Sequence, residues 1–279
     1  MSLGFGTAGI PLSSRPPNLS AGLRRLVELG LNCLEIEFVH GVNISEEGAR
    51  SIAPLAAQLR IRLSVHAPYF INLNAREAEK REAGQKWLLR AARVGWAAGA
   101  ESLVFHPAFY MGDPPEKTLE TVRQALVKIT AELRAEGNQI RLRPETGGKV
   151  SQFGSLEEIL DLCQGLPGVS PCLDFAHLHS RGGADNSYNL FSGILAKVAR
   201  RLGREELDRL HIHISGIVYG PRGELKHQNL PQSDLQYEEL VHALRDSGGS
   251  GNVICESPNL EEDALLLQAS YQSLGPRSG

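Results

Sequence analysis

Short apolar runs alternate with amphipathic segments from one end of this 279-residue chain to the other. The eight apolar runs, each typical of a buried strand, are Leu3–Thr7, Cys33–Phe38, Leu63–Val65, Ser102–Phe105, Ile140–Leu142, Pro171–Phe175, Leu210–Ile214 and Val253–Cys255. Helical patterns lie between them, near residues 19–30, 46–59, 76–98, 116–136, 156–165, 187–202, 236–247 and 261–273. Strands that alternate with helices predict parallel pairing, because each helix carries the chain back to the starting edge of the sheet.

Eight strand–helix units within about 250 residues match the size of a (β/α)8 barrel, the TIM barrel of the α/β class. Strands that are covered on both faces should be continuously apolar, and these mostly are. A doubly wound open sheet has the same alternation and is the structural alternative. No linker rich in Pro, Gly or Ser divides the chain. We therefore expect one barrel domain over residues 1–274 and a disordered tail at 275–279.

The composition limits the compartment and the partners. With a net charge of −3, the chain has no overall attraction for nucleic acid or an anionic membrane, so any DNA-binding face must be local. The four cysteines form no CxxC pair, which indicates buried free thiols in a reducing compartment. The first residues show no signal-peptide pattern, and no run reaches the ~20 apolar residues of a membrane span. We expect a cytoplasmic monomer with no membrane partner.

Six of the apolar runs stop at a histidine, an aspartate or a glutamate. These residues, one on each of the third to eighth predicted strands, are His66, His106, Glu145, Asp174, His213 and Glu256. The carboxyl ends of all strands in a barrel meet on one face, where the active sites of this architecture lie. Residues far apart in sequence are therefore expected to share one pocket, joined by His177 and His227 just beyond strand ends.

Imidazoles and carboxylates without thiolates suit Zn²⁺, Mn²⁺ or Fe²⁺. One zinc ion usually takes three or four protein ligands, so eight candidate ligands imply two or three ions and a carboxylate shared between at least two. Multinuclear sites hold the attacking and leaving oxygens of a phosphoryl displacement. The set of strand-end residues therefore predicts hydrolysis of a phosphodiester.

A single histidine at a strand end is ordinarily a satisfied polar residue, so only the complete set favours a metal centre. His179, His211 and His227 remain candidates for bystanders on this basis. His211 and His213 alternate within one strand, and we expect them to point to opposite sides, so that only one of them faces the pocket.

The strand-end segments resemble the endonuclease IV family, the metal-dependent apurinic/apyrimidinic (AP) endonucleases within the xylose-isomerase-like TIM barrel superfamily. The resemblance covers residues 3–260 and is strongest to an archaeal-type branch, through "GTAGIPLS", "SVHAPYFINLN", "RLRPETGGKVSQFGSLEE", "CLDFAHLH" and "ICESPNLE". It implies cleavage of the DNA backbone 5′ to an abasic site in base excision repair. DNA containing abasic sites is then the expected partner.

The resemblance also implies a trinuclear zinc site, part of which can take Mn²⁺, with Glu145 as the bridging and catalytic carboxylate. His66 and His106 are similar to the terminal ligands of the first zinc. The other ligands carry over to the second and third ions: Asp174, His213 and Glu256 to one, and His177 and His227 to the other. Tyr69 would lie at the DNA-facing rim, and Asn72 and Lys149 are candidate substrate contacts.

The chain departs from the family pattern near the third ion and near the DNA. The family usually has an aspartate two residues before the histidine that corresponds to His227, and this chain has Leu225 there. Glu224, one residue further away, is a candidate substitute with a longer side chain. The loop after the second strand, "EFVHGVNIS", lacks the arginine with which family enzymes hold the flipped-out abasic site.

Two alternative functions are open. A sugar isomerase or epimerase of the same superfamily holds one divalent ion through residues on strands five to eight, and four residues here satisfy that pattern: Glu145, Asp174, His213 and Glu256. Such a mononuclear site would not need His66, His106 or His227. A non-catalytic relative that binds abasic DNA is the second alternative, because Leu225 and the missing arginine both weaken the catalytic pattern.

Overall fold

The computed structural model describes residues 2–183 and 185–275 and contains the eight predicted strands, each within two residues of its expected bounds. They are β1 (Leu3–Ala8), β2 (Cys33–Glu37), β3 (Arg62–His66), β4 (Ser102–Phe105), β6 (Arg141–Pro144), β8 (Leu173–Asp174), β9 (Leu210–Ile214) and β12 (Gly251–Cys255). They form one sheet in the order β6-β4-β3-β2-β1-β12-β9-β8, and every neighbouring pair is parallel.

Backbone contacts between β6 and the residues before β8 close this sheet into a barrel. Leu142 bridges Val169 and Glu145 bridges Cys172, both in the parallel sense. The backbone N–H of Cys172 donates to the carbonyl of Pro144 at 3.0 Å, and that of Thr146 donates to the carbonyl of Cys172 at 3.1 Å. The TIM barrel prediction is therefore confirmed, and the open-sheet alternative is wrong.

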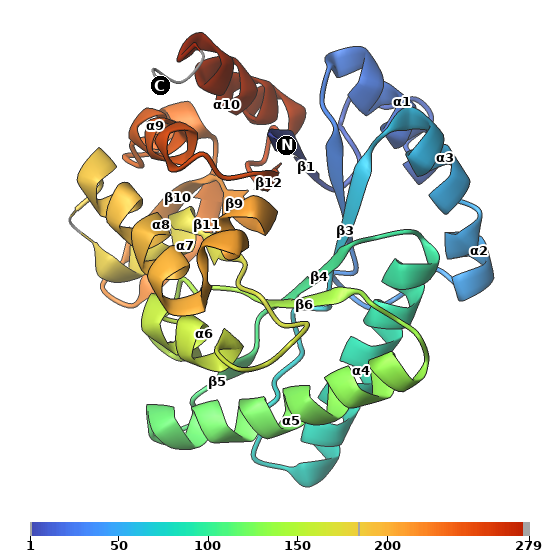
Figure 1. Ribbon diagram of the computed structural model, residues 1–279, viewed down its shortest axis with the longest axis vertical. Helices are drawn as coiled ribbons and strands as arrows, with labels where there is room; N and C mark the ends of the chain where they lie inside the picture. The colour runs from blue at the N-terminus through green and yellow to red at the C-terminus, as the bar shows by residue number, and fades with distance from the viewer. Residues whose placement is uncertain (1, 184, 276–279) are drawn as a thin grey trace.

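Helices surround the sheet on its outer face (Figure 1). The α-helices are α1 (Leu19–Leu29), α2 (Glu46–Arg50), α3 (Ala53–Leu59), α4 (Ala78–Ala97), α5 (Pro115–Ala135), α6 (Leu156–Cys163), α7 (Phe175–Gly182), α8 (Tyr188–Leu202), α9 (Tyr237–Ser247) and α10 (Glu261–Ser273). Short 3-10 turns occupy η1 (Arg204–Arg209) and η2 (Leu230–Gln232). The predicted helix over 46–59 is two helices, and α7 was not predicted.

Period-two alternation in the strands divides the interior into two regions. Side chains such as Leu34, Val65 and Ile212 are fully buried in the apolar layer between strands and helices. The alternate side chains point into the barrel, and many of them are polar, including Glu35 and Arg143. Arg143 donates to Ser102 Oγ and to two backbone carbonyls, so it joins neighbouring strands and does not face the predicted pocket.

Two small antiparallel ribbons extend the loops at the carboxyl ends of the strands: β5 (Ala108–Phe109) pairs with β7 (Gln152–Phe153), and β10 (Gly216–Gly220) pairs with β11 (Gly223–Gln228). Gly223 lets the second ribbon approach the loop after β6, because a Cβ there would lie 2.1 Å from the Gly148 carbonyl oxygen. Its φ of 91° also favours glycine.

No helix within the described residues combines the length and the apolar character that crossing a membrane requires. All four cysteines are buried free thiols, as expected. Of the predicted tail at 275–279, residues 276–279 lie outside the part of the chain that the structure describes.

Candidate metal centre

The predicted strand-end residues converge around the carboxylate of Glu145, which directly follows β6 and is 1% exposed. Its Oε2 lies 3.2 Å from Nε2 of His66 and 3.4 Å from Nδ1 of His106. Its Oε1 lies 3.2 Å from Nδ1 of His213 and 3.3 Å from Nδ1 of His177. Four imidazoles from separate parts of the chain therefore surround one carboxylate.

Two groups of side chains overlap at Glu145. His66, His106 and Glu145 offer ligand atoms that all lie within 4.8 Å of one another. Glu145 also forms such a group on its other side, with Asp174, His213 and Glu256. Nδ1 of His213 lies 3.2 Å from Oε1 of Glu256 as well as from Glu145. A carboxylate common to both groups is positioned to bridge two ions.

A third group contains His177, Glu224 and His227. Oε2 of Glu224 lies 3.5 Å from Nε2 of His177, and its Oε1 lies 3.9 Å from Nε2 of His227. Residues three apart in a regular strand face opposite sides. Here Val218 pairs with Lys226 and Tyr219 with Glu224, so Leu225 bulges out of the ladder at 66% exposure. The bulge brings Glu224 and His227 to the same side.

Asp174 and His177 lie at the start of helix α7. Asp174 ends β8 and caps α7, because its Oδ1 accepts from the backbone N–H of His177 at 2.6 Å. The other oxygen, Oδ2, lies 3.3 Å from Nδ1 of His177. The cap therefore fixes His177 between the second and third groups, and it explains why the predicted strand over 171–175 ends one residue early.

Two polar atoms in these groups lack the hydrogen bonds that buried polar atoms normally make. Asp174 Oδ2 and His106 Nδ1 are buried, and neither has a hydrogen-bond partner among the described residues. Such atoms are uncommon in folded proteins and call for an explanation at each position. Cations held by the two ligand groups, one near His106 and one near Asp174, would satisfy these atoms, and the nitrogen and oxygen donor set suits Zn²⁺ or Mn²⁺. The residues present therefore fit divalent metal ions.

Burial and mutual charge separate the protonation states of these groups. Burial disfavours an ionised Glu145, but His106 and His213 outweigh it and hold the pKa of that carboxyl well below its usual range. Burial raises the pKa of Asp174 to about 7 and lowers that of His106 to about 4. Burial also acts to lower the pKa of His66, yet the hydrogen bond with Glu145 raises it to about 10.

The three predicted substrate contacts occupy different settings. Tyr69, 44% exposed, lies against the rings of His66 and His106 at centroid distances of 5.0 and 5.8 Å. Asn72 accepts hydrogen bonds from the backbone of Asn74 and Phe109, so its amide oxygen is used within the loop. The exposed Lys149 follows Gly148 beside the third group and forms a bridge with Gly223.

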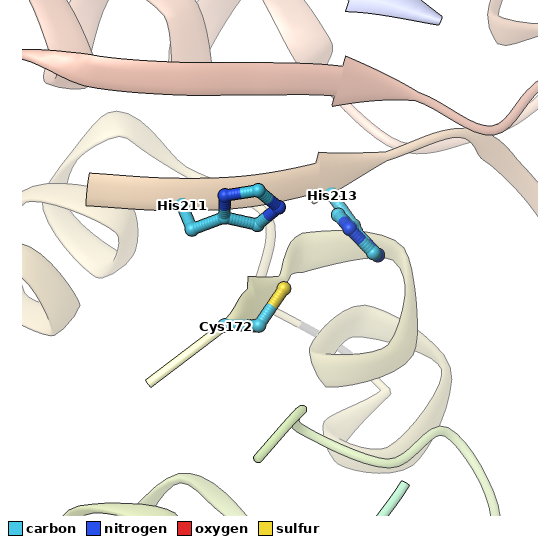
Figure 2. A group of neighbouring side chains, drawn as sticks. All are labelled: Cys172, His211 and His213. Atoms are coloured by element: carbon cyan, nitrogen blue, oxygen red, sulfur yellow. The ribbon is translucent and has the colours of Figure 1, made fainter. Parts of the chain in front are cut away.

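The expectation that His211 and His213 point to opposite sides is wrong. Both side chains leave the same side of β9, towards Cys172 (Figure 2), and both rings lie 2.9 Å from the carboxylate of Glu35. The physical reason is that residues i and i+2 of a strand share a face. His213 reaches the candidate centre through Nδ1, whereas His211 lies one layer deeper in the barrel.

Sequence reasoning missed two acidic residues of β2 that face the same interior. Glu35 contacts both histidines of β9, and Glu37 ends the strand directly beside His66 in register. Burial raises the pKa of Glu37 to about 8. The signal in the sequence was "LEIE", where charged residues alternate with apolar ones in an otherwise buried strand.

The chain is similar to one known protein family and to individual proteins of other organisms. The profile of a family described as xylose isomerase-like TIM barrel matches residues 23–274. An uncharacterised protein of Methanocaldococcus jannaschii is 41% identical over 97% of this chain and 97% of its own length. A protein of Geobacillus sp. named probable endonuclease 4 is 29% identical, over 74% of this chain and 65% of its own length.

Solved structures with the same fold include two kinds of enzyme. Endonuclease IV from Thermus thermophilus has a TM-score of 0.69 and 22% identity, over 91% of this chain and 93% of that structure. A 3-keto-D-glucoside 4-epimerase from E. coli has a TM-score of 0.70 and 15% identity, over 98% of this chain and 100% of that structure. These matches show the fold and do not separate the two activities.

Proposed function

The chain belongs to the xylose isomerase-like TIM barrel family, and within this family we propose that it is a metal-dependent endonuclease that hydrolyses DNA 5′ to an abasic site. The single observation that carries the proposal is the number of ligand groups. Three groups of ligand-type side chains meet at the carboxyl end of the barrel, and the first two share Glu145. A one-ion sugar isomerase would use only the second group.

We assign two or three zinc ions to these groups, with Mn²⁺ as a substitute in part of the site. Such ions, when bound, supply an activated water and stabilise charge on phosphate oxygens. The chain itself contributes a buried carboxylate, Glu145, at the centre of four imidazoles, and we assign it as the catalytic residue. Its low pKa keeps it ionised, so it would accept a hydrogen bond from a water and orient it.

The rim favours a large substrate over a small sugar. Several exposed apolar side chains lie on the loops and ribbons that follow the barrel strands: Leu12, Tyr69, Phe70, Met111, Val150 and Leu225. These side chains share the end of the barrel that carries the ligand groups, and contiguous exposed apolar surface is typical of macromolecular contact sites. Duplex DNA would meet such a rim, with Tyr69, Asn72 and Lys149 as proposed contacts. A sugar without a base stacks poorly, so drawing it out of the duplex costs less than flipping a paired base.

Endonuclease 4 relatives at 29% identity support this activity, and the protein would act as a monomer in the cytoplasm on DNA that contains abasic sites. A sugar epimerase is the second candidate, favoured by the shared fold and by the complete second group. A non-catalytic DNA-binding relative is now less favoured, because Glu224 occupies the third group in spite of Leu225.

The test is incision of a duplex that carries one tetrahydrofuran abasic analogue, which cannot break by elimination. Zinc-loaded protein is expected to make one nick 5′ of the analogue and leave a 3′-hydroxyl. Chelation should remove the activity and added zinc should restore it. Glu145→Gln keeps the size of the side chain and should abolish turnover in a folded protein. More than about a tenth of wild-type activity in that variant would contradict the role of Glu145.

The same protein samples also distinguish the endonuclease from the two alternative functions. Binding to the abasic duplex without a nick, in excess Zn²⁺ or Mn²⁺, would indicate the non-catalytic relative. Epimerisation of a ketose with one Mn²⁺ per chain, and no nick, would indicate the sugar enzyme.

A further inference from the structure

A second layer of polar side chains lies inside the barrel, directly beneath the candidate metal centre. It consists of Glu35, Ser64, Cys172, His211 and the lower edge of His213, and we refer to it as the inner layer. Each of these side chains is at most 1% exposed. Buried polar groups of this kind are costly unless they are paired, so their contacts indicate what they do.

Glu35 contacts three other residues of the inner layer. Its Oε1 lies 2.9 Å from Nε2 of His213, and its Oε2 lies 2.9 Å from Nε2 of His211. Ser64 Oγ donates to the same Oε2 at 2.6 Å. The inner layer therefore holds the Glu35 carboxylate in a fixed position against the underside of His213.

The two nitrogens of His213 face different partners. Nδ1 points up towards Glu145 and Glu256, each at 3.2 Å, and Nε2 points down towards Glu35. A neutral imidazole carries one proton, and that proton resides on the nitrogen that faces the better acceptor. An ionised Glu35 keeps the proton on Nε2, which leaves the Nδ1 lone pair free for a ligand above. A metal-bound histidine commonly donates its other N–H to a carboxylate in this way.

We propose that Glu35 is a positioning residue that sets the tautomer and the ring orientation of His213, with Ser64 and His211 holding Glu35 in place. The inference rests on the proposed metal centre, because it assigns His213 Nδ1 to an ion of the second group. It adds a residue on β2, a strand that contributes no member to the three ligand groups.

A competing interpretation is that Cys172, His211 and His213 hold an ion of their own. Their ligand atoms lie within 4.8 Å of one another, and the sulfur of Cys172 points between the two rings (Figure 2). The contacts of Glu35 favour the positioning role. Nε2 of His211 makes an ordinary hydrogen bond with Oε2 of Glu35 at 2.9 Å, whereas Nε2 of His213 lies equally close to Oε1 but outside hydrogen-bond geometry. Both Nε2 atoms therefore face the Glu35 carboxylate.

Glu35→Gln tests the proposal, with Cys172→Ala as the matched control from the same layer. Glutamine keeps the size of the side chain but replaces one oxygen with a donor and removes the charge. The proton of His213 is then free to move to Nδ1. We measure zinc affinity by chelator competition. The tautomer of His213 is measured by ¹⁵N NMR of the imidazole, in metal-free protein at a pH at which the ring is neutral.

Zinc affinity of Glu35→Gln is expected to fall about 10–100-fold, with a shift of the His213 proton away from Nε2, while Cys172→Ala stays within about twofold of wild type. If Glu35→Gln does not fold, Ser64→Ala takes its place, since it loosens Glu35 without removing the anion and should weaken zinc severalfold. Wild-type affinity and an unchanged tautomer in the Glu35 or Ser64 variant would overturn the proposal.

The outcomes also separate this inference from the proposed function. Loss of one ion in Cys172→Ala would assign a metal to the inner layer and overturn the positioning role. A wild-type chain that binds no zinc would overturn the metal centre and this inference together. A wild-type chain that binds zinc as tightly as a folded Glu35→Gln variant would overturn the inference alone.

Discussion

Replacing Gly148 with alanine disturbs the third ligand group without removing any of its members. A Cβ at this position would lie 2.8 Å from Cδ2 of His177 and 2.8 Å from Cβ of Glu224. The backbone of Gly148 is not in the left-handed region, so alanine adds a methyl group without backbone strain. Any effect of the substitution must therefore come from moving His177, Glu224 or both.

The size of the effect follows from these distances. Ordinary contact begins at 3.4 Å, so the methyl group must displace its neighbours by about 0.6 Å. Catalytic groups tolerate only about 0.5 Å of misplacement, and a displacement of about 1 Å costs on the order of 100-fold in rate. We expect kcat/KM on the abasic duplex to fall about 10–100-fold. The free energy of unfolding should fall by only about 1–3 kcal/mol, the usual cost of overpacking.

Gly182→Ala is the matched control, because Gly182 lies in the same helix as His177 and a methyl group there meets nothing within 4 Å. Both variants are assayed for incision, for zinc content and for thermal unfolding. The control should keep wild-type activity. If Gly148→Ala folds, holds its full complement of zinc and stays within about threefold of wild type, the third group has no part in catalysis and the reasoning fails.

Three further outcomes are expected. Glu224→Ala should lose about one zinc per chain by elemental analysis, whereas Leu225→Asp should leave the zinc content unchanged, because the bulge turns that side chain into solvent; equal losses would refute the bulge argument. Zinc uptake should release protons, and zinc affinity should increase as pH rises. Burial acts to lower the pKa of His66, but the hydrogen bond with Glu145 raises it to about 10, so the imidazole is protonated in the metal-free chain at neutral pH. Calorimetry in buffers of different ionisation enthalpy measures this, and pH-independent affinity would contradict it. Zinc at ~100 times its Kd should raise the free energy of unfolding by about 2.7 kcal/mol, seen as a higher Tm, and an unchanged Tm would count against binding to the folded chain.

The barrel was predictable because strands buried on both faces must be continuously apolar. Runs such as Ser102–Phe105 and Leu210–Ile214 therefore stand out from the helical segments around them, and their bounds are confirmed. The convergence of His66 and Glu145 followed from the same premise, since parallel strands place their carboxyl ends on one face. Position along a strand was enough to bring these two residues together without any knowledge of the loops.

Other features depend on interactions that a linear pattern does not reveal. The bulge at Leu225 arises from the pairing register of β10 and β11, so its effect on Glu224 could not be deduced from spacing alone. Helix α7 begins inside the predicted strand end, because Asp174 serves as strand residue and helix cap at once. Glu35 was missed because a charged residue inside a strand suggests an outward position, whereas this barrel pairs it internally with His211 and His213.

The number of zinc ions per chain tests most directly whether remote strand ends build a multinuclear centre. Protein purified without chelators and dialysed against trace zinc should contain two or three ions by elemental analysis, and His106→Ala should contain fewer. A wild-type chain with a single ion that the His106→Ala variant also retains would contradict the account. A wild-type chain with no ion would contradict it as well.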